Sequence, residues 1–488
     1  MIRKKVKTTT LFMLLFLAPV YLYLLKAQDA EINGFSCFSV LAGKNATTDG
    51  SVMFAHNEDD YGKRLVNWYK VPRVMHDHGE KIILKNGAEA EQVKETCEYL
   101  WLEMPEMEFS DTYFNEYGVI IASDACSSRE DSAEITDGGI GYWLRRLMAE
   151  RSRTAKEAVR TGGRLVEKYG YTGSGRTYCI ADPDEAWLMA VVNGKHWVAQ
   201  RVPDDEVAVL PNYYTIGRIE PEDTVNFLGA KDIIDYAVKR GWYDPENDGE
   251  FIFRKIYGNP SSFGSMSNIA RMWQGVNLLS GEDHDINSEF PFSFKPENKI
   301  SVSDMINVLR DHYENTVYET KYDKDITNPH NHKIMRICSN TNQYGFIAQL
   351  RSNMPAAVGT VLWLAPRRPC IQPFIPWYSG MDKIPDKYSY TDHKTALKQH
   401  FNPPEDIYKD DLDHAFLMYV RQSQKADEDH RAYINKISGK NKSIQQGLFD
   451  QQKAFEEKVL QVYEKDPVKA AKMLSEYTLK CLAKIVID

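Results

Sequence analysis

The chain reads Asn33-Gly-Phe-Ser-Cys37-Phe-Ser-Val-Leu-Ala-Gly43 and, after a short turn, Ser51-Val-Met-Phe-Ala-His56-Asn57-Glu58-Asp59. Residues 38–41 and 52–55 are short apolar runs, and the Asp49-Gly50 pair between them is a strong hairpin signal. The pattern predicts two antiparallel strands joined by a turn. Cys37 would therefore stand at the head of the first strand.

A cysteine in this position is a nucleophile only if a base removes its proton, because a free thiol has a pKa near ~8.5. No histidine lies close on the amino side of Cys37. Cleavage between Ser36 and Cys37 would expose an α-amino group with a pKa near ~7.7–8.0 on the same residue. That amine can take the thiol proton, which is the N-terminal nucleophile mechanism.

The Cys37 hairpin resembles the mature start of the cysteine dipeptidase and secernin family, whose pattern is Cys, Gly, Asp-Gly-Ser and then Asn-Glu-Asp. Further motifs that look like landmarks of this family are Asn115-Glu116, Asp124-Ala-Cys126, Gly138–Tyr142, Ser174–Thr177, Lys195–Arg201, Pro211-Asn212 and Gln349–Arg351. The resemblance covers roughly residues 37–380. It departs at His56, where related enzymes usually carry arginine, so a guanidinium contact from that position is in doubt.

The resemblance implies an α+β fold, the N-terminal-nucleophile hydrolase sandwich (αββα), in which two antiparallel sheets lie between helices. We expect a signal peptide at 1–27, a pro-segment at 28–36, the hydrolase domain at 37–400 and a helical C-terminal extension at 401–488. The signal is indicated by a basic start, an apolar run from Leu11 to Leu25 and a small residue at Ala27. Because Pro19 interrupts the run, we favour a cleaved signal over a membrane anchor.

Local patterns give a coarse order of elements. Helical spacing over 140–151 and a capping box at Thr154–Glu157 predict two helices, and Asn193-Gly194 predicts a two-residue hairpin loop. We further expect a helix over 226–241, a loop-rich stretch lining a cleft over 259–299, a helix over 302–314, a strand over 336–339, a surface loop over 366–376 and helices after 405.

Composition narrows the function. The 488 residues carry a net charge of -9, and this acidic balance argues against nucleic-acid binding. The seven cysteines include no CxxC pair, so they do not form a recognisable disulfide framework, and isolated buried thiols are the default expectation.

Candidate site residues follow from position and from the resemblance. The catalytic candidates are Cys37 as nucleophile, Asp59 to hold the amine, and Asn212, which follows a predicted strand, as an oxyanion donor. Asp124 and Arg336 are candidates for substrate binding. For Asp59 and Asn212 the alternative is an ordinary turn or loop residue.

Two histidine pairs have spacings known from metal ligands, namely His76-Asp-His78 and His330-Asn-His332. Each lies in a polar stretch without further ligands, so we interpret all four as solvated loop histidines. We expect no metal and no cofactor.

The sequence therefore predicts an exported cysteine dipeptidase whose pro-segment is removed before Cys37, with a dipeptide as its substrate. One alternative is the same chemistry on non-peptide amides of the bile-salt or penicillin type. Another is a non-catalytic exported binding protein, which the His56 departure keeps open. Whether the chain forms a homo-oligomer stays open as well.

Overall fold

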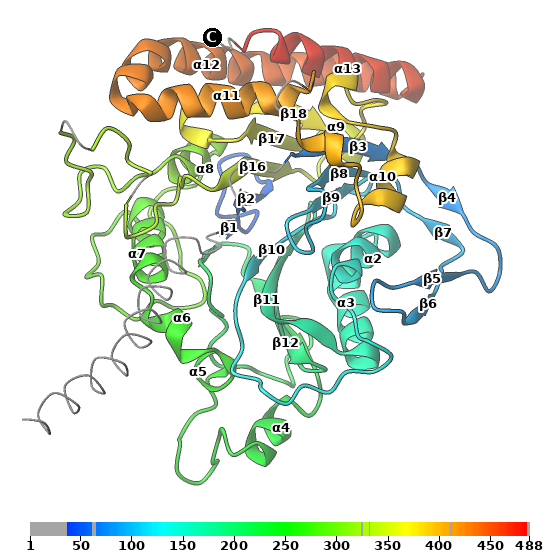
Figure 1. The fold of residues 1–488 in the computed structure, drawn as a ribbon, viewed down its shortest axis with the longest axis vertical. Coiled ribbons are helices and arrows are strands. Elements are labelled where there is room, and N and C mark those ends of the chain that lie inside the picture. The colour runs from blue at the N-terminus through cyan, green and yellow to red at the C-terminus, as the bar shows by residue number, and fades with distance from the viewer. Residues whose placement is uncertain (1–36, 61–64, 324–325, 331, 410–411, 486–488) are drawn as a thin grey trace, which may run out of the picture. The chain divides into compact units, whose positions relative to one another are not determined.

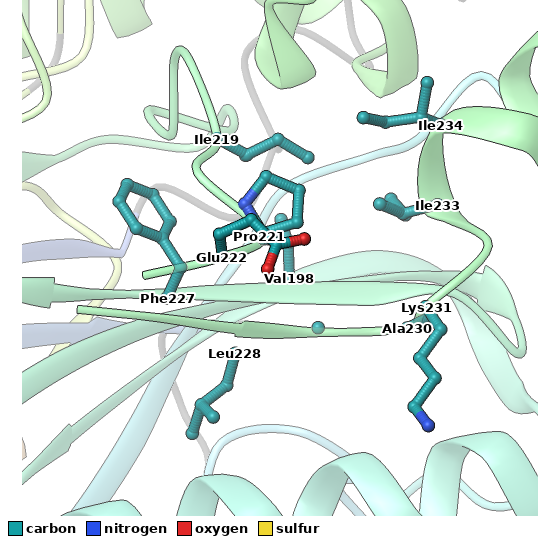
Figure 2. A pocket seen from close by; sticks show the side chains of 11 residues that line it. Val198, Ile219, Pro221, Glu222, Phe227, Leu228, Ala230, Lys231, Ile233 and Ile234 are labelled. Atoms are coloured by element: carbon teal, nitrogen blue, oxygen red, sulfur yellow. The ribbon is translucent and has the colours of Figure 1, made fainter. Parts of the chain in front are cut away.

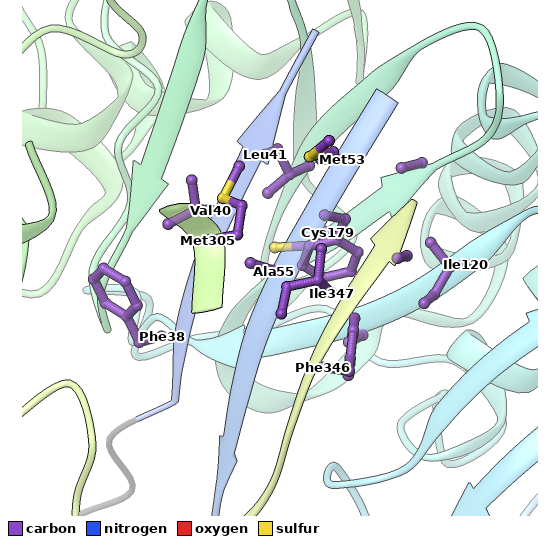
Figure 3. Packing of buried hydrophobic residues seen from close by; sticks show 14 of the residues in the cluster. Phe38, Val40, Leu41, Met53, Ala55, Ile120, Cys179, Met305, Phe346 and Ile347 are labelled. Carbon is purple, nitrogen blue, oxygen red and sulfur yellow. The ribbon is translucent and has the colours of Figure 1, made fainter. Parts of the chain in front are cut away.

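The hairpin after residue 36 is formed as predicted. The computed structural model describes residues 37–60, 65–323, 326–330, 332–409 and 412–485, so the predicted signal peptide and pro-segment lie outside the described residues. β1 (Phe38–Ala42) and β2 (Val52–Asp59) pair antiparallel, with Phe38 opposite Asn57. Gly50 turns the chain at φ 76°. Figure 3 shows the two strands crossing the core with their apolar side chains packed around them.

A six-stranded antiparallel sheet has the order β14-β1-β2-β16-β17-β18. Its remaining strands are β14 (Val207–Leu210), β16 (Asn342–Leu350), β17 (Thr360–Pro366) and β18 (Ile375–Tyr378). β1 lies between β14 and β2, so the head of β1 has neighbours on both sides.

An eight-stranded antiparallel sheet has the order β15-β13-β12-β11-β10-β9-β8-β3. Its strands are β3 (Asn67–Val71), β8 (Tyr99–Glu103), β9 (Thr112–Asn115), β10 (Ile120–Ala125), β11 (Tyr171–Ala181), β12 (Ala186–Gly194), β13 (Trp197–Val202) and β15 (Phe227–Gly229). Side chains alternate between two cores: Ile120 and Leu188 join the core shared with the first sheet, and Ile121 and Trp187 join the second core. This period of two is what buries both faces. Two ribbons, β4 (Val74–Met75) with β7 (Glu95–Thr96) and β5 (Lys81–Ile83) with β6 (Glu89–Glu91), lie apart from both sheets.

Helices cover both sheets (Figure 1). They are α2 (Trp143–Arg151), α3 (Ala155–Tyr169), α4 (Ile233–Lys239), α5 (Phe253–Tyr257), α6 (Pro260–Gly264), α7 (Met266–Ser280), α8 (Val302–Leu309), α9 (Ala356–Gly359), α10 (His393–Gln399), α11 (Ala415–Glu428), α12 (His430–Tyr463) and α13 (Pro467–Leu482). Short 3-10 turns are η1 (Pro369–Ile371), η2 (Asp386–Tyr388) and η3 (Glu405–Tyr408). α2 and α3 pack on the eight-stranded sheet, and α7 and α8 pack on the six-stranded sheet.

The α+β fold class predicted from the resemblance, two antiparallel sheets between helices with added C-terminal helices, is confirmed. α11, α12 and α13 lie along the β17–β18 side of the first sheet (Figure 1, orange and red). Phe416 of α11 and Leu474 of α13 are fully buried in the main core. Among the described residues, none of the helices is both long and apolar enough to span a bilayer.

Several predicted elements need correction. Residues 227–229 form strand β15, because they pair with β13, and only Ile233–Lys239 of that segment is helical. The stretch over 259–299 contains the fifteen-residue helix α7. α8 ends at Leu309 and not at 314, and residues 336–339 form no strand. The proline-rich segment 366–376 is buried and not on the surface, since it runs beneath α11 and α12.

Candidate active site

Strand register brings the predicted nucleophile between two polar residues. Ser39 lies opposite His56 on β2 and opposite Leu210 on β14. Two residues earlier, the same registers set Cys37 beside Glu58 and Asn212. The Cys37 side chain is 2% exposed, and its Sγ lies 3.4 Å from Glu58 Oε1. The thiol is therefore held in a buried, acidic surrounding.

One arginine joins Cys37 to Asn212. Arg271, on α7, donates from Nη1 to the Cys37 carbonyl oxygen at 2.8 Å and from Nη2 to Asn212 Oδ1 at 2.9 Å. Nη2 also donates to Asn268 Oδ1 at 2.6 Å. Gly275 lets α7 come close enough for this contact, because a Cβ at that position would lie 2.8 Å from the ring of Phe38. The guanidinium fixes two of the predicted site residues in one geometry.

The Asn212 amide nitrogen makes no hydrogen bond to any described residue. Asn212 Nδ2 is buried and has no hydrogen-bond partner among the described residues. The other end of the amide is occupied by Arg271, which has only donors to offer. A buried N–H donor without a partner beside the predicted nucleophile is an arrangement suited to an oxyanion hole.

Asp59, the last residue of β2, is held from the adjoining loop. Its carboxylate accepts hydrogen bonds from Ser339 Oγ at 3.1 Å and from Asn342 Nδ2. Its backbone oxygen lies 3.7 Å from Cys37 Sγ. Burial raises the pKa of the Asp59 carboxyl well above its usual value, although Arg271 opposes the shift.

The surroundings of Cys37 favour the protonated form of its thiol. Burial raises the pKa of the Cys37 thiol well above its usual value. Three carboxylates add to the shift, from Glu58, Asp124 and Asp59. A positive charge created next to Cys37 would offset these effects, since an opposite charge favours the ionised form.

A second buried polar cluster lies two residues further along β1, around Ser39. Ser39 Oγ donates to Asp124 Oδ2 at 2.6 Å and lies 2.8 Å from His56 Nδ1, while His56 Nε2 lies 3.0 Å from Glu58 Oε2. Burial lowers the pKa of His56 to about 4 and raises that of Asp124 to about 6. His56 is therefore neutral at pH 7, and the guanidinium that contacts Cys37 comes from Arg271 instead.

The other predicted site residues differ in whether they lie near Cys37. Asp124 Oδ1 is buried without a partner among the described residues. Arg336 donates to the Tyr318 carbonyl oxygen at 2.8 Å and stacks on the Tyr313 ring, and none of these contacts reaches Cys37. Asn115 is structural, because its amide spans the carbonyl oxygens of Ala149 and Ser152.

Sequence reasoning missed Arg271, Glu58 and Ser339. Glu58 was visible as the neighbour of Asp59, and the hairpin register could have singled it out. Arg271 carries no local signal, since it is 234 residues from its partner Cys37 and lies on a helix that we did not expect. The interpretation of His330 as a solvated loop residue is wrong, because its side chain is buried.

A pocket of about 300 Å³ lies elsewhere, between β15 and the start of α4. Figure 2 shows the side chains that line it, which include the apolar Ile219, Phe227 and Ile233 and the charged Glu222 and Lys231. It includes none of the residues that surround Cys37, so it does not belong to the candidate active site.

Curated relatives cover most of the chain. The chain is 29% identical over 378 residues to a probable dipeptidase of Latilactobacillus sakei, covering 74% of this chain and 78% of that protein. It is 26% identical over 374 residues to dipeptidase A of Lactobacillus helveticus, covering 73% and 77%.

Among solved structures, penicillin V acylase from Agrobacterium tumefaciens is 14% identical, with a TM-score of 0.36 and coverage of 68% of this chain and 82% of that chain. The model of "Peptidase family C69" matches residues 36–407 and begins one residue before Cys37. This match spans well over half of the 488 residues, so the chain belongs to peptidase family C69.

Proposed function

We propose that this protein is an exported cysteine dipeptidase, in which Cys37 attacks the peptide bond of a dipeptide after the residues before it are removed. Membership of family C69 and the dipeptidase names of its relatives support the reaction class. The observation that carries the proposal is the unpartnered Asn212 Nδ2, held beside Cys37 by Arg271.

The reaction follows from these positions. The α-amine of a cleaved Cys37 takes the thiol proton, and the thiolate attacks the scissile carbonyl carbon. The oxyanion that forms accepts a hydrogen bond from Asn212 Nδ2. Collapse of this intermediate breaks the C–N bond, and the leaving amine takes the proton from the α-ammonium. Water, deprotonated by the same amine, then attacks the thioester carbonyl carbon. The C–S bond breaks, the carboxylic acid product leaves, and the α-ammonium returns its proton to the Cys37 thiolate.

The carboxylates beside Cys37 suit this cycle. Asp59 and Glu58 stabilise the α-ammonium while it holds the proton, because opposite charges in a buried site attract strongly. The unpartnered Asp124 Oδ1 offers an acceptor for the free amino group of a dipeptide. Arg336 Nε and Nη1 are buried and have no hydrogen-bond partner in the described part of the chain, which keeps Arg336 a candidate for the substrate carboxylate.

The test uses one protein before and after cleavage. Residues 28–36 are replaced by the recognition sequence of a site-specific protease that leaves Cys37 as the first residue. The uncut form should not hydrolyse dipeptides, because an amide nitrogen has no proton affinity to offer, and activity should appear on cutting. If the intact form, verified by mass spectrometry, hydrolyses dipeptides as fast as the cut form, the amine is not the base.

Two further arms address the nucleophile and the substrate. Cys37→Ala should abolish hydrolysis and Cys37→Ser should leave little, since a hydroxyl is the poorer nucleophile with this base. The cut protein is also assayed with penicillin V and a glycine-conjugated bile salt. Faster turnover of either compound than of dipeptides would move the assignment to acyl-conjugate hydrolysis.

A further inference from the structure

Four metal-binding side chains meet at a point away from Cys37. His312 follows α8, His330 and Cys338 lie in the loop before β16, and Cys370 lies in η1. One ligand atom from each of these residues lies within 4.8 Å of all the others. His312, His330 and Cys338 are buried, and Cys370 is partly exposed.

The separations match the edges of a tetrahedron around a zinc ion. Bond lengths of about 2.0–2.1 Å to nitrogen and about 2.3 Å to sulfur imply edges of about 3.3 Å between nitrogens and about 3.6 Å between nitrogen and sulfur. His312 Nε2 lies 3.0 Å from His330 Nε2. His330 Nε2 lies 3.8 Å from Cys338 Sγ and 3.5 Å from Cys370 Sγ.

We propose that His312, His330, Cys338 and Cys370 bind a structural zinc ion. Two thiolates and two imidazoles are a common zinc set, and their charges sum to zero with Zn²⁺, so the complex can be buried without a residual charge. Because four protein ligands fill a tetrahedral site, no position is left for water or substrate, and the role is structural.

The surroundings of the ligands fit the proposal. A zinc ion on Nε2 requires the proton on Nδ1, and a carboxylate commonly accepts it. His312 Nδ1 lies 2.8 Å from Glu314 Oε1, and His330 Nδ1 lies 3.5 Å from Asp427 Oδ1. Arg368 Nη1, 2.7 Å from His330 Nδ1, competes for this contact and also pairs with Asp427, so on metal binding Arg368 keeps Asp427 and gives up the imidazole.

A third histidine lies next to the two histidines of the cluster. His430, the first residue of α12, has its Nε2 3.6 Å from Cys370 Sγ, and its ring lies 5.0 Å from that of His330. It can donate to the Cys370 thiolate, which stabilises a metal-bound sulfur. The cluster thereby connects the loop before β16 with the start of the C-terminal helices.

Metal binding would replace a hydrogen bond inside the cluster. His312 Nε2 and His330 Nε2 lie 3.0 Å apart and share one hydrogen bond. Zinc binds cysteine as thiolate and histidine through an unprotonated nitrogen, so the ion would take the place of this hydrogen bond at the centre of the four ligands.

The ion would also support the active site. Cys338 immediately precedes Ser339, whose hydroxyl donates to Asp59, and Asn342, the first residue of β16, donates to the other carboxylate oxygen. A metal that fixes Cys338 fixes this loop. Loss of zinc should therefore lower thermal stability first and dipeptidase activity as a consequence.

The experiment measures metal in the full chain, purified without chelators and then incubated with ZnSO₄ and desalted. We expect inductively coupled plasma mass spectrometry to find about one zinc ion per chain. X-ray absorption at the zinc edge should show two sulfur and two nitrogen neighbours. Replacement by Co²⁺ should give the visible bands of a tetrahedral cobalt thiolate, and chelation should lower Tm.

Variants locate the site. Cys338→Ser and Cys370→Ser should each lose most of the bound zinc, whereas Cys481→Ser and His332→Ala should keep it, because Cys481 lies in α13 outside the cluster and His332 is exposed. If the cysteine variants do not fold, the X-ray absorption spectrum and the visible spectrum of the cobalt form of the unaltered protein test the ligand set. Absence of zinc after incubation, a Cys338–Cys370 disulfide in the native protein, or an oxygen-only zinc shell would overturn the proposal.

Discussion

The orientation of the Asn212 amide is set by chemistry. The oxygen and the nitrogen of a carboxamide group have nearly the same size and shape, so only their hydrogen-bond partners show which is which. Arg271 can only donate, and its contact therefore identifies the near end as Oδ1. The amide N–H₂ is left buried and unpaired, at a cost of about 1–3 kcal/mol that a bound oxyanion would recover.

This geometry predicts a selective effect on the rate. Asn212→Ala should lower kcat of the Cys37-start enzyme by about 10²–10³-fold, with a much smaller change in KM, because the lost donor acts on the oxyanion and not on the ground-state carbonyl. Asn212→Asp should be at least as damaging, since it replaces the donor by an acceptor. Steady-state kinetics on a dipeptide measure both.

The matched control is Asn268→Asp. Asn268 also accepts from Arg271, and its Nδ2 donates to the backbone oxygens of Ser262 and Asn212, so its replacement disturbs the same guanidinium and the Asn212 backbone without removing the Asn212 amide donor. Its kcat should fall much less than that of Asn212→Asp. Equal losses in the two variants would assign the effect to Arg271 and remove the case for Asn212 as oxyanion donor.

Residues with a local signal were predictable and residues without one were not. Cys37 could be found because a predicted signal peptide and a predicted strand start precede and include it, and Asn212 because it follows a strand directly. Arg271 and the four-residue zinc cluster depend on contacts between distant segments, for example 40 residues between His330 and Cys370. Spacing rules written for compact ligand motifs do not detect such a set.

Among helices and strands, too, those with a local sequence signal were predictable and those without one were not. Hairpins around Gly50 and Gly194 were predicted because their turn residues specify them. The loop at Gly194 has three residues and not the predicted two, since the Val192 N–H donates to the His196 carbonyl oxygen across residues 193–195. α7 was missed because it has no side-chain cap, no acidic residue in its first turn and no basic residue in its last. β15 was mistaken for helix, since its strand conformation comes from pairing with β13 and not from its own residues.

The cap of α11 predicts a pH dependence of stability. His414 Nδ1 accepts from the Phe416 N–H at 3.1 Å and Nε2 donates to Asn67 Oδ1 at 3.1 Å, a pattern that needs the neutral ring. Burial lowers the pKa of His414 to about 4. The unfolded chain binds this proton near ~6.5, so stability present above pH ~6.5 is lost as the pH falls toward 4, by up to about 3 kcal/mol.

The measurement compares unfolding free energies from urea titrations at several pH values. His414→Asn keeps a side-chain cap but does not titrate, so its stability should fall less steeply than that of the unaltered protein between pH 6.5 and 4. His78→Asn, at an exposed histidine, is the control and should match the unaltered slope. If the stability of all three proteins falls equally with pH, His414 binds its proton in the folded protein as readily as in the unfolded chain, and the prediction is wrong.

At the scale of the whole molecule, the C-terminal helices are tied to the first sheet by a buried ion pair. Arg351, directly after β16, donates from both terminal nitrogens to the two oxygens of Glu456 on α12, each at 2.7 Å. Glu456 also accepts from Tyr378 OH at 3.0 Å. This bidentate geometry satisfies the charges where water cannot reach them.

The pair predicts an asymmetric mutational response. Glu456→Gln should destabilise the protein by about 3–5 kcal/mol in denaturant unfolding, because it leaves the Arg351 charge buried without a counter-ion, whereas the double variant Arg351→Met/Glu456→Leu should recover most of the loss. Lys387→Ala, which breaks the exposed pair with Asp413, should cost less than about 1 kcal/mol. If Glu456→Gln costs no more than Lys387→Ala, the ion pair does not hold α12 on the sheet, and apolar residues such as Leu448 and Val459 alone dock the helix.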